Sequence, residues 1–407
     1  MKKFCLYFQV HQPFRLRGYH FFNIARHHDY FDDPLNKRLL KKVAENCYLP
    51  ANKLFLNLFK RYHGRFKIAL SISGTALDQF ELYAPEVIGS FQELVSTGSV
   101  ELLAETDMHS LASLVSPQTF KAQVNQHMEK IGYYFHQSPA VFRNTELIYA
   151  NHIGKMLAGM GFRGTVAEGV SQLLENRSPN HVYTSADRKP FKLLLRNFPL
   201  SDDISFRFSD RAWDHWPLTV DKFLNRIDNM DPSHEIINLF MDYETLGEHQ
   251  KKESGIFDFI RNLPEHVFKS GVHEFCTPAK AMEEIAPAGQ IDVPEPASWA
   301  DSEKDLSAWL GNDMQKEAFE NLYALEASIT QIDDASIIND WRYLQTSDHF
   351  YYMSTKLHSD GEVHNYFNPY RSPYEAFINY MNVVNDLTIR ISKKITKKEA
   401  IHQSDHH

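Results

Sequence analysis

The sequence predicts an α/β protein in which a closed or nearly closed parallel barrel is followed by a helical C-terminal region. Seven apolar segments of strand length recur between residues 4 and 241, with amphipathic segments between them. The apolar segments do not alternate with polar residues, which indicates strands buried on both faces, as in a parallel sheet. This number of units favours a barrel over a dinucleotide-binding sheet, and no GxGxxG motif follows the first segment.

The expected elements follow one another along the chain. The predicted strands cover residues 4–10, 66–73, 100–104, 140–144, 164–169, 191–197 and 236–241. Apolar residues at helical spacing predict helices between them, for example over residues 36–63, 84–97 and 119–135. In the last of these, Val124, Met128 and Ile131 keep the spacing of one helix face.

The pattern changes after the last barrel unit. Residues 286–302 contain three prolines and no periodicity, which predicts a linker or a loop that folds back over the barrel. Helical patterns then cover 303–331, with room for a kink at Gly311, and also 339–356 and 373–392. The predicted division is therefore a catalytic barrel (1–285), a linker or cleft loop (286–302), a helical C-terminal domain (303–393) and a frayed polar tail (394–407).

Charge and cysteine content exclude several classes of protein. The formal charge of −9 argues against nucleic acid and against an anionic membrane surface as partners, because both attract basic proteins. Three widely spaced cysteines without a CxxC motif predict reduced thiols rather than a disulfide framework or a zinc knuckle. No stretch is long enough to span a bilayer, and the N-terminal apolar run lacks a cleavage site, so we expect a cytoplasmic protein. The oligomeric state is not encoded in any pattern that we can read.

Polar side chains, most of them ionisable, follow four of the predicted strands. In chain order they are His11 with Gln12, Glu105 with Asp107 and His109, Glu146, and Asp242 with Glu244. Because the carboxyl ends of barrel strands meet at one rim, these side chains predict a site there. Two carboxylates that face each other across a glycosidic bond are the usual apparatus for sugar hydrolysis, one ionised and one carrying a proton. Strand position alone does not choose between Asp242, Glu244 and the nearby Glu248.

Two other classes of function fit parts of this pattern. His11, His109 and Asp107 could be metal ligands, as in a barrel-type deacetylase, although no tight ligand spacing groups them. A non-catalytic carbohydrate-binding protein would suit the aromatic share of 13%, but it would not need paired carboxylates. Trp213, in a polar loop, and Trp299, in the linker, are candidates for stacking on sugar, whereas the helical spacing around Trp309 predicts core packing.

Several motifs resemble the ordered sequence blocks of glycoside hydrolase family 57, in particular its compact α-amylase-type members. They are "HQP" at 11–13, "VELLAETDMHSL" at 100–111, "FRNTELIYAN" at 142–151, "FMDYETLGEH" at 240–249 and "LQTSDHFYYM" at 344–353, together with "WADSEKDLSAWLGNDMQ" at 299–315. The resemblance implies an incomplete (β/α)7 barrel with a helical C-terminal domain that helps to build the cleft. It also implies α-glucan substrates, retention of anomeric configuration and no metal or other cofactor.

The resemblance also assigns residues by matched position. It implies that Glu146 is the nucleophile and Asp242 the general acid/base, and that His11, His109 and Asp348 line the substrate cleft. We expect Gln12, Trp213 and Trp299 to contact substrate as well. The implied reaction is cleavage of α-1,4 bonds in glycogen, starch or maltodextrins. Transfer of glucan by a 4-α-glucanotransferase uses the same catalytic pair, and the sequence does not separate the two reactions.

Overall fold

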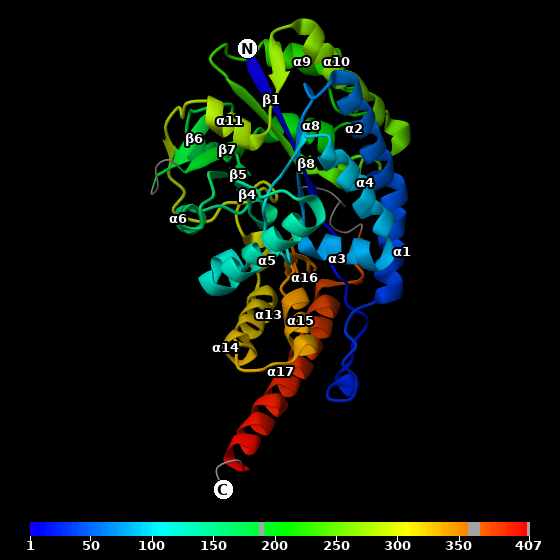
Figure 1. The fold of residues 1–407 in the computed structure, drawn as a ribbon, viewed down its shortest axis with the longest axis vertical. Helices are drawn as coiled ribbons and strands as arrows, with labels where there is room; N and C mark the ends of the chain where they lie inside the picture. Colours follow the sequence, from blue (N-terminus) through cyan, green and yellow to red (C-terminus); the bar gives the residue numbers. More distant parts are fainter. Residues whose placement is uncertain (187–190, 357–366, 405–407) are drawn as a thin grey trace.

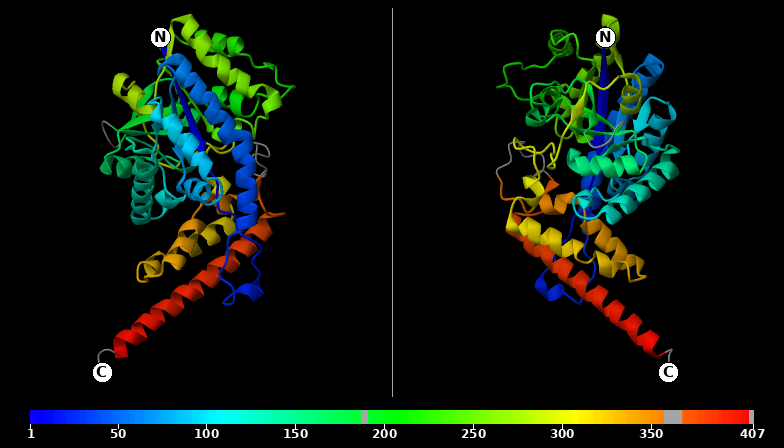
Figure 2. Two further views of the ribbon diagram at one scale, coloured as in Figure 1. Left: turned by 45° about the vertical axis from the view of Figure 1, so that its right-hand side comes forward. Right: turned by 90° about the vertical axis from the view of Figure 1, so that its left-hand side faces the viewer.

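A computed structural model of the chain describes residues 1–186, 191–356 and 367–404, with side chains described through residue 398. It has two parts: a parallel barrel in the upper half of Figure 1, and C-terminal helices beneath it. Strand β1 runs from the N-terminus toward those helices, so the carboxyl ends of the barrel strands face them (Figures 1 and 2). No helix among the described residues has both the length and the apolar character needed to cross a membrane.

The barrel contains seven parallel strands at the positions predicted from the sequence. They are β1 (Lys2–Val10), β2 (Ile68–Ile72), β3 (Val100–Leu102), β4 (Val141–Arg143), β5 (Gly164–Glu168), β7 (Lys192–Arg196) and β8 (Ile236–Asp242). Strand β1 lies between β2 and β8, with Tyr7 opposite both Ala69 and Phe240. Their side chains fill the barrel with an apolar core that includes Tyr7, Val141, Leu194 and Phe240.

The two sheets of the barrel meet along two seams, and neither seam is a full strand ladder in the part of the chain that the structure describes. A parallel bridge between Ala104 and Phe142 connects β3 to β4. Within the described residues, β7 and β8 are joined by single hydrogen bonds, such as Asn197 N–H to the Asn238 carbonyl, instead of a strand ladder. The fold is therefore an incomplete (β/α)7 barrel, as the resemblance implied.

Three short strands were not predicted from the sequence. They are β6 (Val182–Ser185), which pairs antiparallel with β7, β9 (His273–Phe275), which pairs with β1, and β10 (Gln290–Ile291), which pairs with β6. They are two to four residues long, and no longer apolar run marks them in the sequence.

Helices surround the barrel. They are α1 (Asp33–Val43), α2 (Leu49–Tyr62), α3 (Gly74–Tyr83), α4 (Pro85–Ser96), α5 (Pro117–Phe135), α6 (Asn151–Gly159), α7 (Ser171–Leu174), α8 (Phe198–Ser205), α9 (Val220–Asp228), α10 (Ile256–Ser270) and α11 (Pro278–Glu284). A π-helical turn at Ala44–Tyr48 joins α1 to α2. Sequence signals explain the best predicted helix, α5: Ser116 caps its N-terminus by accepting from Thr119 N–H, and Pro117 occupies its first turn.

The C-terminal helices differ from the prediction in their lengths. They are α12 (Ser307–Leu310), α13 (Asp313–Tyr323), α14 (Glu326–Ile329), α15 (Ala335–Leu344), α16 (Ser347–Tyr351) and α17 (Pro373–Ser404). The single helix predicted over 303–331 is wrong, because Asn312 and Gln315 form a capping box that starts a new helix after Gly311. The helix predicted over 339–356 is also interrupted, because Thr346 has a non-helical backbone with ψ of 129° and bridges to Ser110.

The frayed polar tail predicted over 394–407 stays a prediction, and its last three residues lie outside those that the structure describes. Helix α17 continues to residue 404 and projects from the body of the molecule (Figure 2). The sequence from 373 to 404 has no glycine, and its one proline is the first residue of α17, so no local signal ends the helix earlier. The predicted boundaries between barrel, linker and C-terminal domain stay predictions, although β10 and the residues around Ala297 do return to the barrel, as a cleft loop would.

Candidate active site

The polar side chains that follow the strands meet in one pocket at the carboxyl end of the barrel. Its lining contains five of the residues named from the sequence blocks: His11, His109, Glu146, Asp242 and Asp348. The other lining residues are Gln9, Gln12, Pro13, Arg15, Arg143, Glu244, His249, Trp299, Tyr351, Tyr352 and Phe367. Residues from the barrel, from the loop at 286–302 and from the C-terminal region therefore line one pocket.

Glu146 is held by two N–H donors. The His109 ring Nε2 lies 3.2 Å from Oε1, and the Trp299 indole Nε1 donates to Oε2 at 2.6 Å. Trp299 is positioned by its own backbone, whose N–H donates to the Glu146 carbonyl at 3.2 Å. The backbone of Glu146 is left-handed, with φ of 56°, which costs about 1 kcal/mol or more for a residue with a side chain. Backbone strain of this kind persists only where the surrounding structure holds the residue in place, and it is concentrated at active sites and ligand-binding segments.

His109 lies between two carboxylates. Its Nδ1 is 3.1 Å from Glu105 Oε2, and its Nε2 faces Glu146. An ionised carboxylate can only accept, so both ring nitrogens must donate and the ring is an imidazolium. Burial alone would lower the pKa of His109, but the hydrogen bonds and charges of Glu105 and Glu146 outweigh burial and raise it to about 9.

Glu105 binds the side of the His109 ring that faces away from Glu146. Burial would raise the pKa of its carboxyl group, but the hydrogen bond and charge of His109 lower it to about 2. Its other oxygen accepts from Gln9 Nε2 at 3.1 Å. The order Gln9–Glu105–His109–Glu146 therefore links the barrel interior to the carboxylate that faces the pocket.

His11 stacks on His109 and reaches the C-terminal domain. The two rings are 3.8 Å apart and nearly parallel, at 17°. Burial and the charge of His109 lower the pKa of His11, so His11 is the neutral member of the pair. A neutral ring then donates from Nε2 to Asp348 at 2.9 Å and accepts at Nδ1 from the Ser73 hydroxyl at 2.8 Å. Asp348 is thus the point at which helix α16 contributes to the site.

Three carboxylates follow β8, and the structure gives them different surroundings. Asp242 is half-buried at the end of the strand and lines both the pocket and an adjoining hollow. Glu244 is almost fully buried and accepts from the Tyr48 hydroxyl. Burial, then the neighbouring charge of Asp242, raises the pKa of Glu244 to about 8. Glu248 points elsewhere, toward Asn46 Nδ2 at 2.7 Å and Lys251 Nζ at 3.3 Å.

Some expected residues are not in the pocket. Trp213 is half-buried, lies beside Arg207 and packs against the barrel's helical shell, so it is absent from the described lining. Trp309 is core, as predicted, with 1% of its surface exposed. Asp107 turns away from the histidines and accepts from Arg342 Nη2 at 2.7 Å. In the described part of the chain, no three His, Cys, Asp or Glu side chains gather as a metal site would require.

Gln12, which was expected to contact substrate, lines the pocket, and so does Arg15, which the sequence did not single out. Arg15 and Gln12 contact each other, through Nη2 and Oε1 at 3.3 Å, and Gln12 donates to the Tyr48 hydroxyl at 3.2 Å. Arg143, three residues before Glu146 in the sequence, lines the same pocket. Tyr351 and Tyr352 come from the C-terminal region, and their approach to the barrel depends on tertiary packing.

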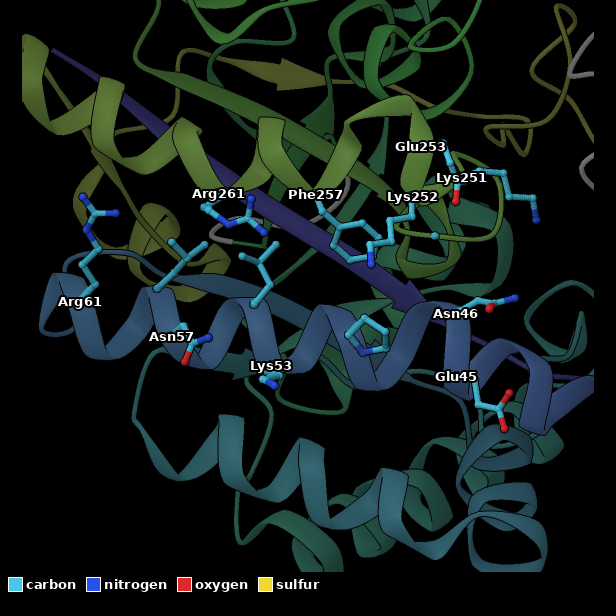
Figure 3. A pocket seen from close by; sticks show the side chains of 14 residues that line it. Glu45, Asn46, Lys53, Asn57, Arg61, Lys251, Lys252, Glu253, Phe257 and Arg261 are labelled. Atoms are coloured by element: carbon cyan, nitrogen blue, oxygen red, sulfur yellow. The ribbon is translucent and has the colours of Figure 1, made fainter.

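A larger hollow lies elsewhere on the barrel. It measures about 870 Å³, against about 80 Å³ for the pocket around Glu146, and lies between α2 and α10 (Figure 3). Its labelled side chains include Lys53, Arg61, Phe257 and Arg261, which lie along two helices and not at strand ends. Size alone would select this hollow, but the convergence of ionisable groups at the strand ends selects the pocket around Glu146 as the candidate active site.

A parallel barrel that presents carboxylates from different strand ends in one pocket is typical of glycoside hydrolases. The family model of glycosyl hydrolase family 57 matches residues 5–294. A protein of Methanocaldococcus jannaschii described as "Putative alpha-amylase" is 41% identical over 408 aligned residues, covering 96% of this chain and 85% of that protein. The chain belongs to glycosyl hydrolase family 57 and is a glycoside hydrolase, as the sequence blocks predicted.

Solved structures of low sequence identity share the fold. A family 57 branching enzyme from Thermococcus kodakaraensis has a TM-score of 0.67 at 14% identity, with 87% of this chain and 86% of that chain covered. The α-amylase AmyC from Thermotoga maritima has a TM-score of 0.62 at 12% identity, with 95% and 93% covered. A 4-alpha-glucanotransferase from Thermococcus litoralis has a TM-score of 0.64 at 14% identity, and this chain covers 56% of its length.

Proposed function

We propose that the protein is a retaining α-glucan hydrolase of the α-amylase type, which cleaves α-1,4 bonds of glycogen, starch or maltodextrins. The observation that carries the proposal is the Glu146 carboxylate, held by His109 and Trp299 in a pocket that Asp242 also lines. The name of the Methanocaldococcus jannaschii relative supports the same activity.

In the proposed reaction, Glu146 attacks the anomeric carbon while Asp242 protonates the leaving oxygen. The bond to the leaving sugar breaks as the ester to Glu146 forms. Water then attacks the same carbon, gives its proton to Asp242 and releases Glu146. Because His109 and Trp299 donate to its two oxygens, Glu146 stays ionised and keeps one orientation for attack. This mechanism requires the two carboxyl groups to lie about 5–5.5 Å apart.

Glu244 is a rival for the acid. Its raised pKa of about 8 means that it carries a proton at neutral pH, as a general acid must. We assign the role to Asp242 because Asp242 is more exposed, whereas Glu244 is enclosed and already engaged with Tyr48. The proton on Glu244 then serves to limit the negative charge beside Asp242, since two close carboxylates do not both ionise readily.

Product analysis tests the proposed function. Incubation with maltoheptaose should give shorter oligosaccharides whose new reducing ends are first released as α-anomers, which proton NMR distinguishes from β-anomers. Initial release of β-anomers would contradict retention. Products longer than maltoheptaose would show glucan transfer instead of hydrolysis, because a sugar hydroxyl would then resolve the intermediate. Azide should restore turnover in Glu146→Ala and give the inverted glycosyl azide, because it then attacks the anomeric carbon directly in place of the missing carboxylate.

A further inference from the structure

Arg143 is a buried arginine whose guanidinium group makes no hydrogen bond to the described part of the chain. It ends strand β4, three residues before Glu146, and its side chain has no exposed surface. None of its three guanidinium nitrogens has a hydrogen-bond partner among the residues that the structure describes. Buried charged donors are normally satisfied, and an exception calls for an explanation.

A second arginine nearby shows that the exception is specific to Arg143. Both guanidinium groups lie over the Trp299 ring, Arg143 at 5.1 Å and Arg196 at 5.7 Å from its centre. Arg196 is also buried, but it donates to the Phe240 carbonyl at 2.8 Å, to Glu168 at 3.2 Å and to Asp202 at 2.6 Å. Each guanidinium nitrogen of Arg196 has a partner within the protein, whereas no guanidinium nitrogen of Arg143 has one among the described residues.

The position of Arg143 indicates what would satisfy it. Arg143 lines the pocket together with Glu146 and Asp242. The Trp299 indole that it contacts is the one that donates to Glu146. A sugar whose anomeric carbon is within reach of Glu146 therefore has its ring substituents close to the guanidinium group. Sugar hydroxyls are good acceptors, and a planar guanidinium can donate to two neighbouring ones.

We propose that Arg143 is a substrate-binding residue that donates to hydroxyl oxygens of the glucose unit attacked by Glu146. This assignment rests on the proposed function and adds to it a determinant of specificity. The guanidinium donors are desolvated before the substrate arrives, so a sugar that lacks the matching hydroxyl leaves a buried cation unpaired. Such a site rejects the deoxygenated sugar more strongly than a site made of neutral groups.

The competing explanation is structural. In it, Arg143 serves only to balance the Glu105 charge and to pack on Trp299. A lysine keeps the positive charge but loses the planar pair of donors, and a methionine keeps only the apolar stem. Arg143→Lys, Arg143→Met and the matched control Arg196→Lys therefore separate charge, packing and hydrogen bonding.

The test uses nitrophenyl α-maltotrioside and its analogues that lack one hydroxyl, at C2, C3 or C6 of the glucose unit bearing the nitrophenyl group. In the wild type, kcat/KM should fall roughly ten- to hundredfold for at least one analogue. Arg143→Met should lose a similar factor on the parent substrate and then show no further loss on that analogue. Arg143→Lys should retain part of the discrimination, and Arg196→Lys should retain all of it.

The outcomes distinguish this proposal from the proposed function. If the wild type does not cleave the parent substrate, the proposed function fails and the assignment of Arg143 fails with it. If the parent is cleaved but Arg143→Met and Arg143→Lys discriminate among the analogues as the wild type does, only the assignment of Arg143 is wrong. Circular dichroism melting curves identify a variant that does not fold, and Arg143→Lys then decides the question.

Discussion

The charge state of His109 predicts how activity depends on pH. A shift of the His109 pKa from its ordinary 6.5 to about 9 corresponds to roughly 3 kcal/mol in favour of the imidazolium. Since the pKa of His109 is raised in the folded protein, this contribution to the stability of the folded state is fully present below pH 6.5. It is lost as pH rises through about 9. When the His109 ring loses a proton, one of its two nitrogens no longer carries a hydrogen and cannot donate to the carboxylate oxygen that it faces. The hydrogen bond to Glu146 or to Glu105 then breaks, and kcat/KM should fall above about pH 9.

Glu105→Gln tests this reasoning. It removes the charge of one of the two carboxylates that hold the proton on His109, so the alkaline limb of the profile of kcat/KM against pH should move down by about one pH unit or more. The matched control is Asp107→Asn, in the same loop, whose carboxylate binds Arg342 and Lys130 instead of His109. That variant should lose stability but keep the alkaline limb in place. An alkaline limb that stays near pH 9 in Glu105→Gln would refute the account of the His109 charge.

Three further predictions concern the same pocket. Trp299→Phe keeps most of the ring but removes the indole N–H donor to Glu146, so kcat should fall roughly ten- to hundredfold; unchanged kinetics would show that this hydrogen bond is irrelevant. Asp242→Asn should lose most of its activity on starch but much less on substrates with a good leaving group, which need little protonation. Glu244→Gln should keep far more activity on starch than Asp242→Asn. If Asp242→Asn is instead the more active of the two on starch, Glu244 is the acid. Treatment with EDTA should leave activity intact, because two carboxylates suffice for this reaction; a loss restored by a divalent ion would revive the metal-dependent alternative.

The barrel strands and the rim of the site were predictable because they rest on local signals. An apolar run without alternation identifies a buried strand wherever it occurs, and strand ends in a parallel barrel share one rim. His11, His109, Glu146 and Asp242 come together for that reason.

The details of the site depend on tertiary structure. His109 and Glu146 both adopt positive φ, and a histidine or glutamate in a sequence does not predict that conformation. The hydrogen bond from Trp299 depends on a loop that returns over the barrel from more than a hundred residues away. Trp213 was expected to contact substrate because its sequence neighbours are polar. Its ring instead packs against the barrel's helical shell, outside the described pocket lining.

The most direct test of the central claim is to trap the covalent intermediate. A fluorinated maltotriosyl fluoride that forms the glycosyl ester quickly and hydrolyses slowly should label the protein once, and peptide mass spectrometry should locate the sugar on Glu146. The account predicts that label and its absence from Glu146→Gln. A label on Asp242 or Glu244, or steady turnover with release of inverted products and no label, would contradict it.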